Sequence, residues 1–327
     1  MRRTLDARHD RFALTAPFRI SRGVKTAADV VTVTIREGDF TACGESMPYP
    51  RYGESVEIVL AQIAAVERQI AEGAGRKDLL ALMAPGAARN ALDCALWDLE
   101  AKRDGQSVAS LLGAPEPGRI ATALTVVIDT PEAMARAAAA IADAPLIKVK
   151  VNADDPASAV RAVRRAAPKA ALIVDPNESW NEALVKAMMP VLEECAVAVL
   201  EQPVPAGEDA WLEGYSRPVP ICADESIHTV AELDTVAARY DAVNVKLDKS
   251  GGLTAGLELV RATRERGLKL MSGCMICSSL GIAPALHIAR LADWADLDGP
   301  LWLAEDRAGG VTAEKGWLRP PSEGFWG

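Results

Sequence analysis

The sequence contains few histidines, few positive charges relative to negative ones, and no long hydrophobic run. Its three histidines share no metal-ligand spacing, and two of them, His228 and His287, fall in predicted helices, where packing is the better interpretation. No apolar stretch approaches the roughly 20 residues that a membrane-spanning helix needs, and the basic start lacks the apolar region of a secretory signal. The 36 basic and 45 acidic residues give a net charge of −9, which argues against nucleic-acid or anionic-membrane partners. We therefore expect a cytoplasmic protein.

Cysteine is also sparse, and its six positions form no recognisable framework. The cysteines are scattered through apolar segments, a pattern that suits reduced, buried thiols better than disulfides. Cys274 and Cys277 make a single CxxC motif, without the second cysteine pair or the neighbouring histidines that a zinc site would require. No thioredoxin-like context surrounds the motif, so we favour packing over a redox role for this pair.

The first part of the chain predicts a mixed α+β unit. Val30–Ile35 and Asp39–Cys43 read as an antiparallel pair of strands joined across Gly38. Apolar residues then recur at helical spacing over Glu54–Glu72 and over "ARNALDCALWDLEAKRDG", which ends at Gly105, a typical helix-stop residue. The turn-rich "GAPEPGR" that follows marks the predicted domain boundary.

The rest of the chain alternates short apolar strands with alanine-rich amphipathic helices. Successive strand centres lie roughly 22 to 26 positions apart, the spacing of βα units that build a parallel sheet. A run of six or more such units favours a closed (β/α) barrel over an open doubly wound sheet. No GxGxxG or Walker motif follows the first strand, so a nucleotide-binding interpretation is weak. The predicted strands are "ATALTVVI", "LIKVKV", "ALIVD", "AVAVLE", "VPICADE", "DAVNVKL" and "LKLMSG".

Acidic residues end three consecutive strands of this predicted barrel: Asp175 in "LIVDPN", Glu201 in "AVLEQP" and Asp224 in "PICADES". A single carboxylate in such a position often only caps the next helix. Three of them, however, meet at the C-terminal face of a barrel, where active sites lie. Converging carboxylates repel one another unless a hard cation lies between them, and ligation by oxygen alone suits Mg²⁺. The sequence therefore predicts a magnesium site.

Lysines flank these acidic residues on both sides. Lys148 and Lys150 alternate with apolar residues in "LIKVKVN", so both point to one face of their strand, and Lys246 lies near the end of "VNVKLDK". A strand-end lysine is usually solvated. Beside a metal-bound carboxylate, however, lysines from opposite sides could remove and return the proton on the neighbouring carbon, and the cation should lower their pKa values. This predicts racemisation or epimerisation. Asp248 and Lys249 are expected to be structural, with Lys249 on the other face.

Five motifs, "KVK", "VDPNESW", "LEQP", "CADES" and "NVKLDKSGGL", resemble in order and spacing the enolase superfamily, muconate-cycloisomerase-like subgroup. The likeness runs nearly end to end, and with "PYPRYGES" and "DLDGPLWLA" it is closest to the L-Ala-D/L-Glu dipeptide epimerases. The resemblance implies an α/β fold: an α+β capping domain over residues 1–118 with a specificity loop near 18–25, and a modified TIM barrel, (β/α)7β, over 119–300. Residues 301–327 would return to the capping domain.

The resemblance also implies a role for each site residue. Asp175, Glu201 and Asp224 match the ligands of one Mg²⁺ per active site. Lys150 and Lys246 match the two acid/base residues on opposite faces of the substrate α-carbon. The remaining matches concern the substrate: Lys148 for its carboxylate and the enediolate, Asp296 and Asp298 for its α-ammonium group, Arg22 for its glutamate side chain, and Thr125 for a further contact.

The implied function is Mg²⁺-dependent epimerisation of L-Ala-D-Glu to L-Ala-L-Glu, and the reverse, in peptidoglycan-peptide metabolism. Epimerases of other dipeptides stay open as alternatives. A cycloisomerase and an o-succinylbenzoate synthase also stay open, because they share the metal site and the lysines. The substrates of these two enzymes carry no ammonium group, so "DLDGP" argues against both. An acid-sugar dehydratase would place a histidine near the seventh strand, and "LKLMSGCM" has none. A non-enzymatic barrel would not need opposed lysines. The expected partner is a small dipeptide, and a homo-oligomer is compatible with the resemblance.

Overall fold

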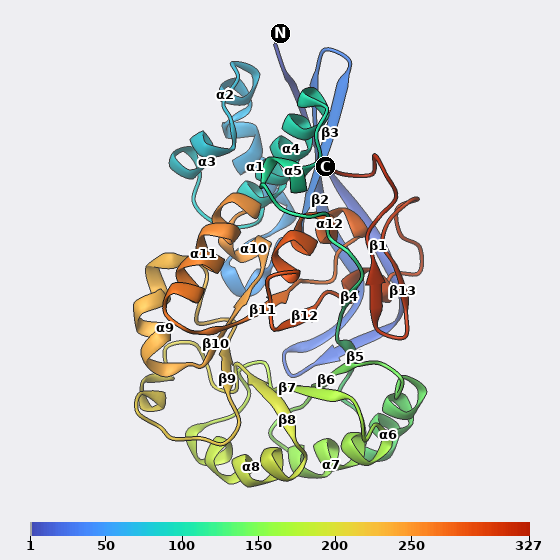
Figure 1. Cartoon of the computed structure of the whole chain (residues 1–327), viewed down its shortest axis with the longest axis vertical. Coiled ribbons are helices and arrows are strands. Elements are labelled where there is room, and N and C mark those ends of the chain that lie inside the picture. The colour runs from blue at the N-terminus through green and yellow to red at the C-terminus, as the bar shows by residue number, and fades with distance from the viewer. Residues whose placement is uncertain (1) are drawn as a thin grey trace.

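The computed structural model describes residues 2–327 and places a parallel barrel beside an antiparallel sheet covered by helices (Figure 1). The sheet consists of β1 (Thr4–Ile20), β2 (Gly23–Glu37) and β3 (Phe40–Ser46), in that order. The predicted antiparallel pair corresponds to β2 and β3 and is confirmed, although both strands are longer than expected. The sequence analysis missed β1, because its residues alternate between exposed and half-buried and include many charged side chains.

Helix α4 (Ala87–Asp104) packs between this sheet and the barrel, and nearly all of its residues are buried. The approach is close, since a Cβ atom at Gly44 on β3 would overlap the carbonyl oxygen of Ala91. The helix ends at Gly105 with φ of 62°, a left-handed conformation that favours glycine, as the sequence predicts. The prediction of a single helix over Glu54–Glu72 is wrong in one respect, because the structure has two helices there, separated at Val66. The helices beside α4 are α1 (Val56–Ala65), α2 (Glu67–Ala71), α3 (Arg76–Leu82) and α5 (Val108–Leu111).

The predicted parallel barrel is confirmed, with eight strands in consecutive order from β5 to β12. Its two ends are joined where the Ala123 N–H donates to the Ala295 carbonyl at 2.8 Å, so the sheet closes nearly into a ring. Most of the strands are short, largely buried apolar runs, as expected for a parallel sheet covered on its outer face, and β5 is the more exposed exception. The strands are β5 (Leu124–Val126), β6 (Leu146–Lys150), β7 (Ala171–Asp175), β8 (Val197–Glu201), β9 (Ile221–Ala223), β10 (Ala242–Val245), β11 (Lys269–Gly273) and β12 (Trp294–Asp296).

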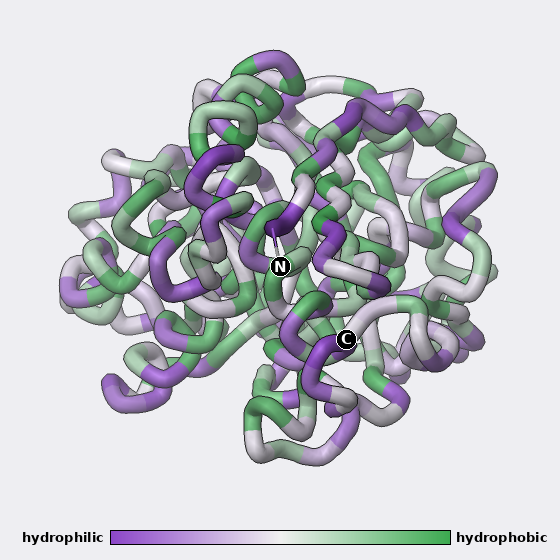
Figure 2. The backbone as a smooth tube through the Cα atoms, turned by 90° about the horizontal axis from the view of Figure 1, so that it is seen from above, coloured by the Kyte–Doolittle hydropathy of each residue, from purple (hydrophilic) through white to green (hydrophobic). Residues whose placement is uncertain are grey.

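Helices surround the barrel, and hydrophilic and hydrophobic stretches alternate along the outer segments (Figures 1 and 2). Several of them begin at a side-chain cap, for example Thr130, Asp155 and Asn181, each of which accepts a backbone N–H of the first turn. Within residues 2–327, no helix is both long and apolar enough to cross a bilayer. The helices are α6 (Pro131–Ala140), α7 (Pro156–Ala166), α8 (Glu182–Glu194), α9 (Leu233–Arg239), α10 (Leu247–Ser250), α11 (Leu253–Glu265) and α12 (Ser279–Ala289), with 3-10 turns η1 (Pro50–Tyr52), η2 (Ala210–Leu212), η3 (Val230–Glu232) and η4 (Gly299–Trp302).

The C-terminal segment contacts both parts of the chain. Strands β13 (Thr312–Glu314) and β14 (Trp317–Arg319) form a small sheet with β4 (Ile120–Ala121). Beyond them, the Trp326 indole N–H donates to the Cys94 carbonyl on α4 at 3.1 Å. The domain boundaries at 118 and 300 stay predictions.

Two smaller expectations have different outcomes. The cysteines are free thiols, as predicted. His287 lies in α12, but the prediction of a helix at His228 is wrong, because His228 lies in the loop between β9 and η3. Its ring packs edge-on against Tyr52 with the centroids 4.5 Å apart.

Candidate active site

A cavity lies where the C-terminal ends of the barrel strands face the β1–β2 turn. All three lysines expected to act on the substrate line it, and so do the predicted substrate contacts. The barrel geometry explains this convergence, because parallel strands end at the same rim. The cavity-lining residues that the sequence predicts are Arg22, Thr125, Lys148, Lys150, Lys246, Asp296 and Asp298.

Lys148 is the central cation of the site and is 2% exposed. Its Nζ lies 2.9 Å from Asp175 Oδ2, 2.7 Å from Glu201 Oε2 and 2.7 Å from Asp296 Oδ2. Burial alone would lower the pKa of Lys148, but the surrounding carboxylates, Asp175 first, hold it well above its ordinary value. The carboxylates and the ammonium group therefore form one buried charge network.

The other two lysines approach from separate strands. Lys150 Nζ donates to Asp175 Oδ2 at 2.5 Å and to Asn177 Oδ1 at 3.0 Å, and Lys246 Nζ donates to Asp224 Oδ2 at 2.6 Å. In the sheet order, β6, which carries Lys150, is separated from β10, which leads into Lys246, by three strands. The two ammonium groups thus enter the cavity from different sides of the barrel.

The expected position of Lys249 is wrong. Rather than pointing to the other face, its Nζ donates to Asp224 Oδ1 at 2.6 Å and to the Asn244 carbonyl at 3.1 Å. Lys246 is the N-cap of the one-turn helix α10, so the helical spacing of three residues brings Lys249 to the same side as Lys246. Asp248, in contrast, accepts the Met47 N–H at 3.0 Å and joins the loop to the capping sheet.

The three acidic residues at the strand ends are buried together, with at most 1% exposure. Burial, with the negative charges of Asp175 and Asp224, raises the pKa of Glu201 to about 7, while Lys246 and Lys249 hold the pKa of Asp224 well below its ordinary range. Glu201 Oε2 forms an ion pair with Lys148 at 2.7 Å. Three crowded carboxylates offer the oxygen ligands that a hard divalent cation prefers. Among residues 2–327, no three acidic, histidine or cysteine side chains are arranged to hold a metal ion. The ammonium group of Lys148 lies between the carboxylates of Asp175 and Glu201.

The carboxylates of "DLDGP" line the cavity beside Lys148. Asp298 Oδ2 accepts the backbone N–H of Thr125 at 2.9 Å and the Trp302 indole N–H at 3.2 Å. Burial and the neighbouring Asp296 raise the pKa of Asp298 to about 6. Asp296 Oδ1 is buried without a hydrogen-bond partner among the described residues. This pair offers an unsatisfied acceptor and excess negative charge, the requirements for binding a cationic group.

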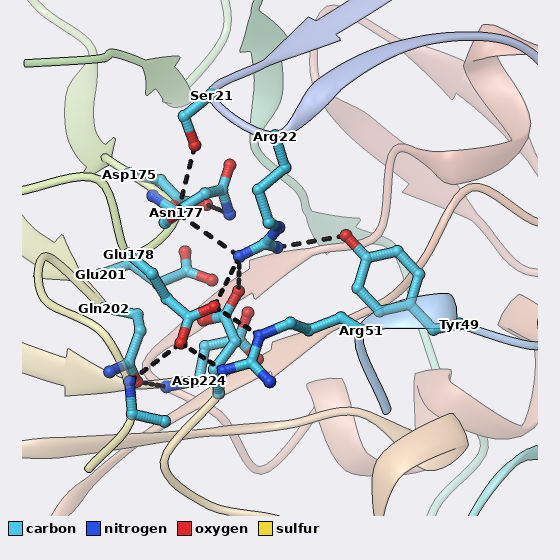
Figure 3. Close-up of polar contacts among 12 residues, drawn as sticks. Ser21, Arg22, Tyr49, Arg51, Asp175, Asn177, Glu178, Glu201, Gln202 and Asp224 are labelled. Atoms are coloured by element: carbon cyan, nitrogen blue, oxygen red, sulfur yellow. Dashed lines mark hydrogen bonds and ion pairs between the residues drawn. The ribbon is translucent and has the colours of Figure 1, made fainter. Parts of the chain in front are cut away.

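The β1–β2 turn reaches over the cavity and is tied to the barrel by Ser21 and Arg22 (Figure 3). Arg22 Nη1 lies 3.0 Å from Glu178 Oε2 and 2.7 Å from Glu225 Oε1, and Arg22 Nη2 donates to the Tyr49 hydroxyl at 3.1 Å. Burial would lower the pKa of Arg22, but Glu225 and Tyr49 raise it above its ordinary value. The Ser21 hydroxyl donates to the Asn177 carbonyl at 3.1 Å. The turn therefore docks on the loops that follow β7 and β9.

Sequence reasoning missed the residues that receive this turn. Arg51 donates to Glu178 through two nitrogens, at 2.9 and 2.8 Å, a bidentate geometry. Asn177 and Glu178 have φ of 47° and 67°, and Gln202 has φ of 32°, so three non-glycine residues beside the site adopt left-handed backbone. Glu178 falls inside "VDPNESW" and Arg51 inside "PYPRYGES", but nothing in these motifs indicates that the two side chains meet.

Comparisons with known families cover nearly the whole chain. Residues 2–113 match the N-terminal domain of the mandelate racemase / muconate lactonizing enzyme family, and residues 132–324 match the enolase C-terminal domain-like family. An L-Ala-D/L-Glu epimerase from Escherichia coli (strain K12) is 47% identical over 306 residues, which cover 93% of this chain and 95% of that protein. An N-acetyl-D-glutamate racemase from Pseudoalteromonas sp is 40% identical over 300 residues, covering 91% of this chain and 95% of that one.

Solved structures share the same fold. An enolase family member from Agrobacterium tumefaciens with homology to dipeptide epimerases, bound to sodium and L-Ala-L-Glu, matches with a TM-score of 0.97 and 48% identity, covering 99% of this chain and 100% of that chain. A dipeptide epimerase from Cytophaga hutchinsonii, complexed with Mg and D-Ala-L-Val, matches with a TM-score of 0.91 and 26% identity, covering 100% of this chain and 98% of that one.

Proposed function

Because the chain belongs to the mandelate racemase / muconate lactonizing enzyme family of the enolase superfamily, we propose that it is a dipeptide epimerase that interconverts L-Ala-D-Glu and L-Ala-L-Glu. One observation carries the proposal. A single cavity holds Lys150 and Lys246 on different sides and, beside them, the unsatisfied carboxylate oxygen of Asp296. A substrate that presents an ammonium group to Asp296 can thus expose one carbon to two lysines.

In the proposed reaction, one lysine removes the proton from the glutamate α-carbon and the other returns a proton to the opposite face. Lys150 and Lys246 exchange these roles with the direction of the reaction. Lys148 stabilises the negative charge that grows on the substrate carboxylate as the proton leaves. Mg²⁺, one per site and held by Asp175, Glu201 and Asp224, would supply further positive charge to the same carboxylate oxygens.

The remaining contacts hold the dipeptide in position. Asp296 and Asp298 bind its α-ammonium group, and Thr125 fixes Asp298 through its backbone N–H. Arg22 faces the side-chain carboxylate of the second residue from the capping side. Because the substrate would be a peptide of L-alanine and D-glutamate, the proposal includes a role in cytoplasmic peptidoglycan-peptide metabolism.

A second candidate is racemisation of an N-acylated glutamate, the activity named for one relative. Such a substrate has no ammonium group and would leave the buried oxygen of Asp296 without a donor, which costs binding energy. The same argument disfavours cycloisomerase and o-succinylbenzoate synthase substrates. The site thus favours the dipeptide.

The experiment is proton exchange in D₂O with Mg²⁺. L-Ala-D-Glu, L-Ala-L-Glu and N-acetyl-D-glutamate are incubated separately with the protein, and deuterium incorporation and stereochemistry are followed by NMR. We expect deuterium only at the glutamate α-carbon of the dipeptides, and each diastereomer should give the other. Absence of exchange with every dipeptide would overturn the proposal, and faster exchange in N-acetyl-D-glutamate would support the second candidate.

A further inference from the structure

A second cation, Lys25, lies on the capping side of the cavity and, among residues 2–327, has no carboxylate partner. It lies near the start of β2 and pairs across the sheet with Phe18, and both residues line the cavity. Its Nζ lies 4.7 Å from the centre of the Tyr49 ring. Among residues 2–327, Lys25 forms no ion pair and no side-chain hydrogen bond. Its neighbour on the strand, Asp29, is engaged by His9 at 2.8 Å and by Arg11 at 3.1 Å.

The charge of Arg22, in contrast, is already balanced. Arg22 and Arg51 face the carboxylates of Glu178 and Glu225, so two cations meet two anions in one connected group. A substrate carboxylate arriving at Arg22 alone would add a third negative charge to this group. The surplus positive charge on this side of the cavity belongs to Lys25.

We propose that Lys25 supplies the additional positive charge that the side-chain carboxylate of an acidic dipeptide needs beside Arg22, whose own charge is balanced by the two glutamates that fix the turn, Glu178 and Glu225. Lys25 is thus a specificity-determining residue of the site. This inference rests on the proposed dipeptide epimerase function and names the residue that selects an acidic second position.

The electrostatic surroundings give the proposal a pH signature. Burial first, and then the charges of Arg22 and Lys246, lower the pKa of Lys25 to about 8, and Asp29 opposes them only in part. The other group that faces the ammonium is the ring of Tyr49. Above pH 8 the free enzyme therefore loses the charge of Lys25, and its affinity for an acidic side chain should fall. The affinity for a dipeptide with an apolar second residue should not depend on the charge of Lys25.

The test compares kcat/KM for L-Ala-L-Glu with kcat/KM for L-Ala-L-Met in matched variants. Lys25→Gln should lower the Glu/Met ratio roughly 10- to 100-fold, the usual effect of losing a hydrogen bond to a charged group. Lys25→Arg should restore the ratio, because arginine keeps the charge. Lys77→Gln makes the same charge change on the exposed face of α3, away from the cavity, and should leave the ratio at the wild-type value.

A pH series supplies an independent readout. Both dipeptides lose the charge of their own α-ammonium group near pH 8, so the readout is the ratio of the KM for L-Ala-L-Glu to the KM for L-Ala-L-Met. This ratio should rise above pH 8 in the wild type and not in Lys25→Arg, whose guanidinium stays protonated. If Lys25→Gln keeps the wild-type ratio while the wild type epimerises both dipeptides, the inference about Lys25 is wrong and the proposed function stands. If the wild type epimerises no dipeptide, both are wrong. Circular dichroism of Lys25→Gln checks that the half-exposed substitution leaves the fold intact.

Discussion

Replacement of Lys249 by methionine should destabilise the metal-free protein and strengthen Mg²⁺ binding at the proposed site. Lys249 is 2% exposed and donates to Asp224 Oδ1, to the Asp224 carbonyl and to the Asn244 carbonyl. Methionine has a similar length and fills the same space, so the perturbation is the loss of one charge and three hydrogen bonds. Asp224 keeps Lys246 at 2.6 Å on its other oxygen.

The magnitude follows from these contacts. Removing one partner of a buried ion pair costs about 3–5 kcal/mol. Because Lys246 still compensates part of the charge of Asp224, we expect the lower end, a loss of about 3 kcal/mol in the free energy of unfolding. Lys186→Met is the matched control. Lys186 is 50% exposed and pairs with Glu182 one helical turn away, and such pairs contribute less than about 1 kcal/mol.

Urea unfolding of both variants, each with and without Mg²⁺, measures these effects. A cation bound near Asp224 replaces part of the lost charge, so Mg²⁺ should stabilise Lys249→Met relative to its metal-free form and should bind this variant with a lower Kd than the wild type. Titration calorimetry gives that Kd directly. A free energy of unfolding within about 1 kcal/mol of the wild type, with an unchanged Mg²⁺ affinity, would refute the reasoning.

Four further predictions concern the catalytic site and the stability of the fold. Lys150→Ala and Lys246→Ala should each lower epimerisation by roughly 10²- to 10⁴-fold, with residual deuterium exchange from a single diastereomer, and normal epimerisation by either variant would contradict the two-base assignment. Asp296→Asn should raise the KM for L-Ala-L-Glu roughly 10- to 100-fold and change N-acetylglutamate binding much less in parallel assays. Chelation of divalent metal should stop exchange, and Mg²⁺ at 100 times its Kd should raise the free energy of unfolding by about 2.7 kcal/mol in urea titrations. Burial lowers the pKa of His287 from 6.5 to about 4 in the folded protein. As the pH falls from 6.5 to 4, the unfolded chain therefore takes up a proton at His287 that the folded protein does not bind. About 3 kcal/mol of stability should be lost there, and His287→Gln should lose less between pH 7 and 4.

The charged strand ends were predictable because two simple regularities place them. Side chains on a strand alternate between faces, so Lys148 and Lys150 had to share one face. Parallel strands of a barrel end at the same rim, so Asp175, Glu201 and Asp224 had to lie at that rim. Neither regularity depends on loop conformation.

The misplacement of Lys249 shows where such reasoning stops. The alternation of side chains along a strand predicts that Lys249 points away from Lys246. The strand β10 ends at Val245, however, and the helical turn α10 begins immediately after Lys246. Helical spacing then brings Lys249 beside Lys246, and both ammonium groups reach Asp224. The error came from applying the wrong period at an element boundary.

The sequence by itself determined the parallel barrel, the antiparallel strand pair before it and the set of charged residues at the barrel rim, because these follow from local periodicity and strand direction. Only the tertiary structure decided how the β1–β2 turn docks. Glu178 and Glu225 follow different strands, and both reach Arg22. That pairing balances the charge of Arg22, whereas Lys25 has no carboxylate partner among residues 2–327. Such long-range charge balance depends on three-dimensional proximity and has no signature in the spacing of residues along the chain.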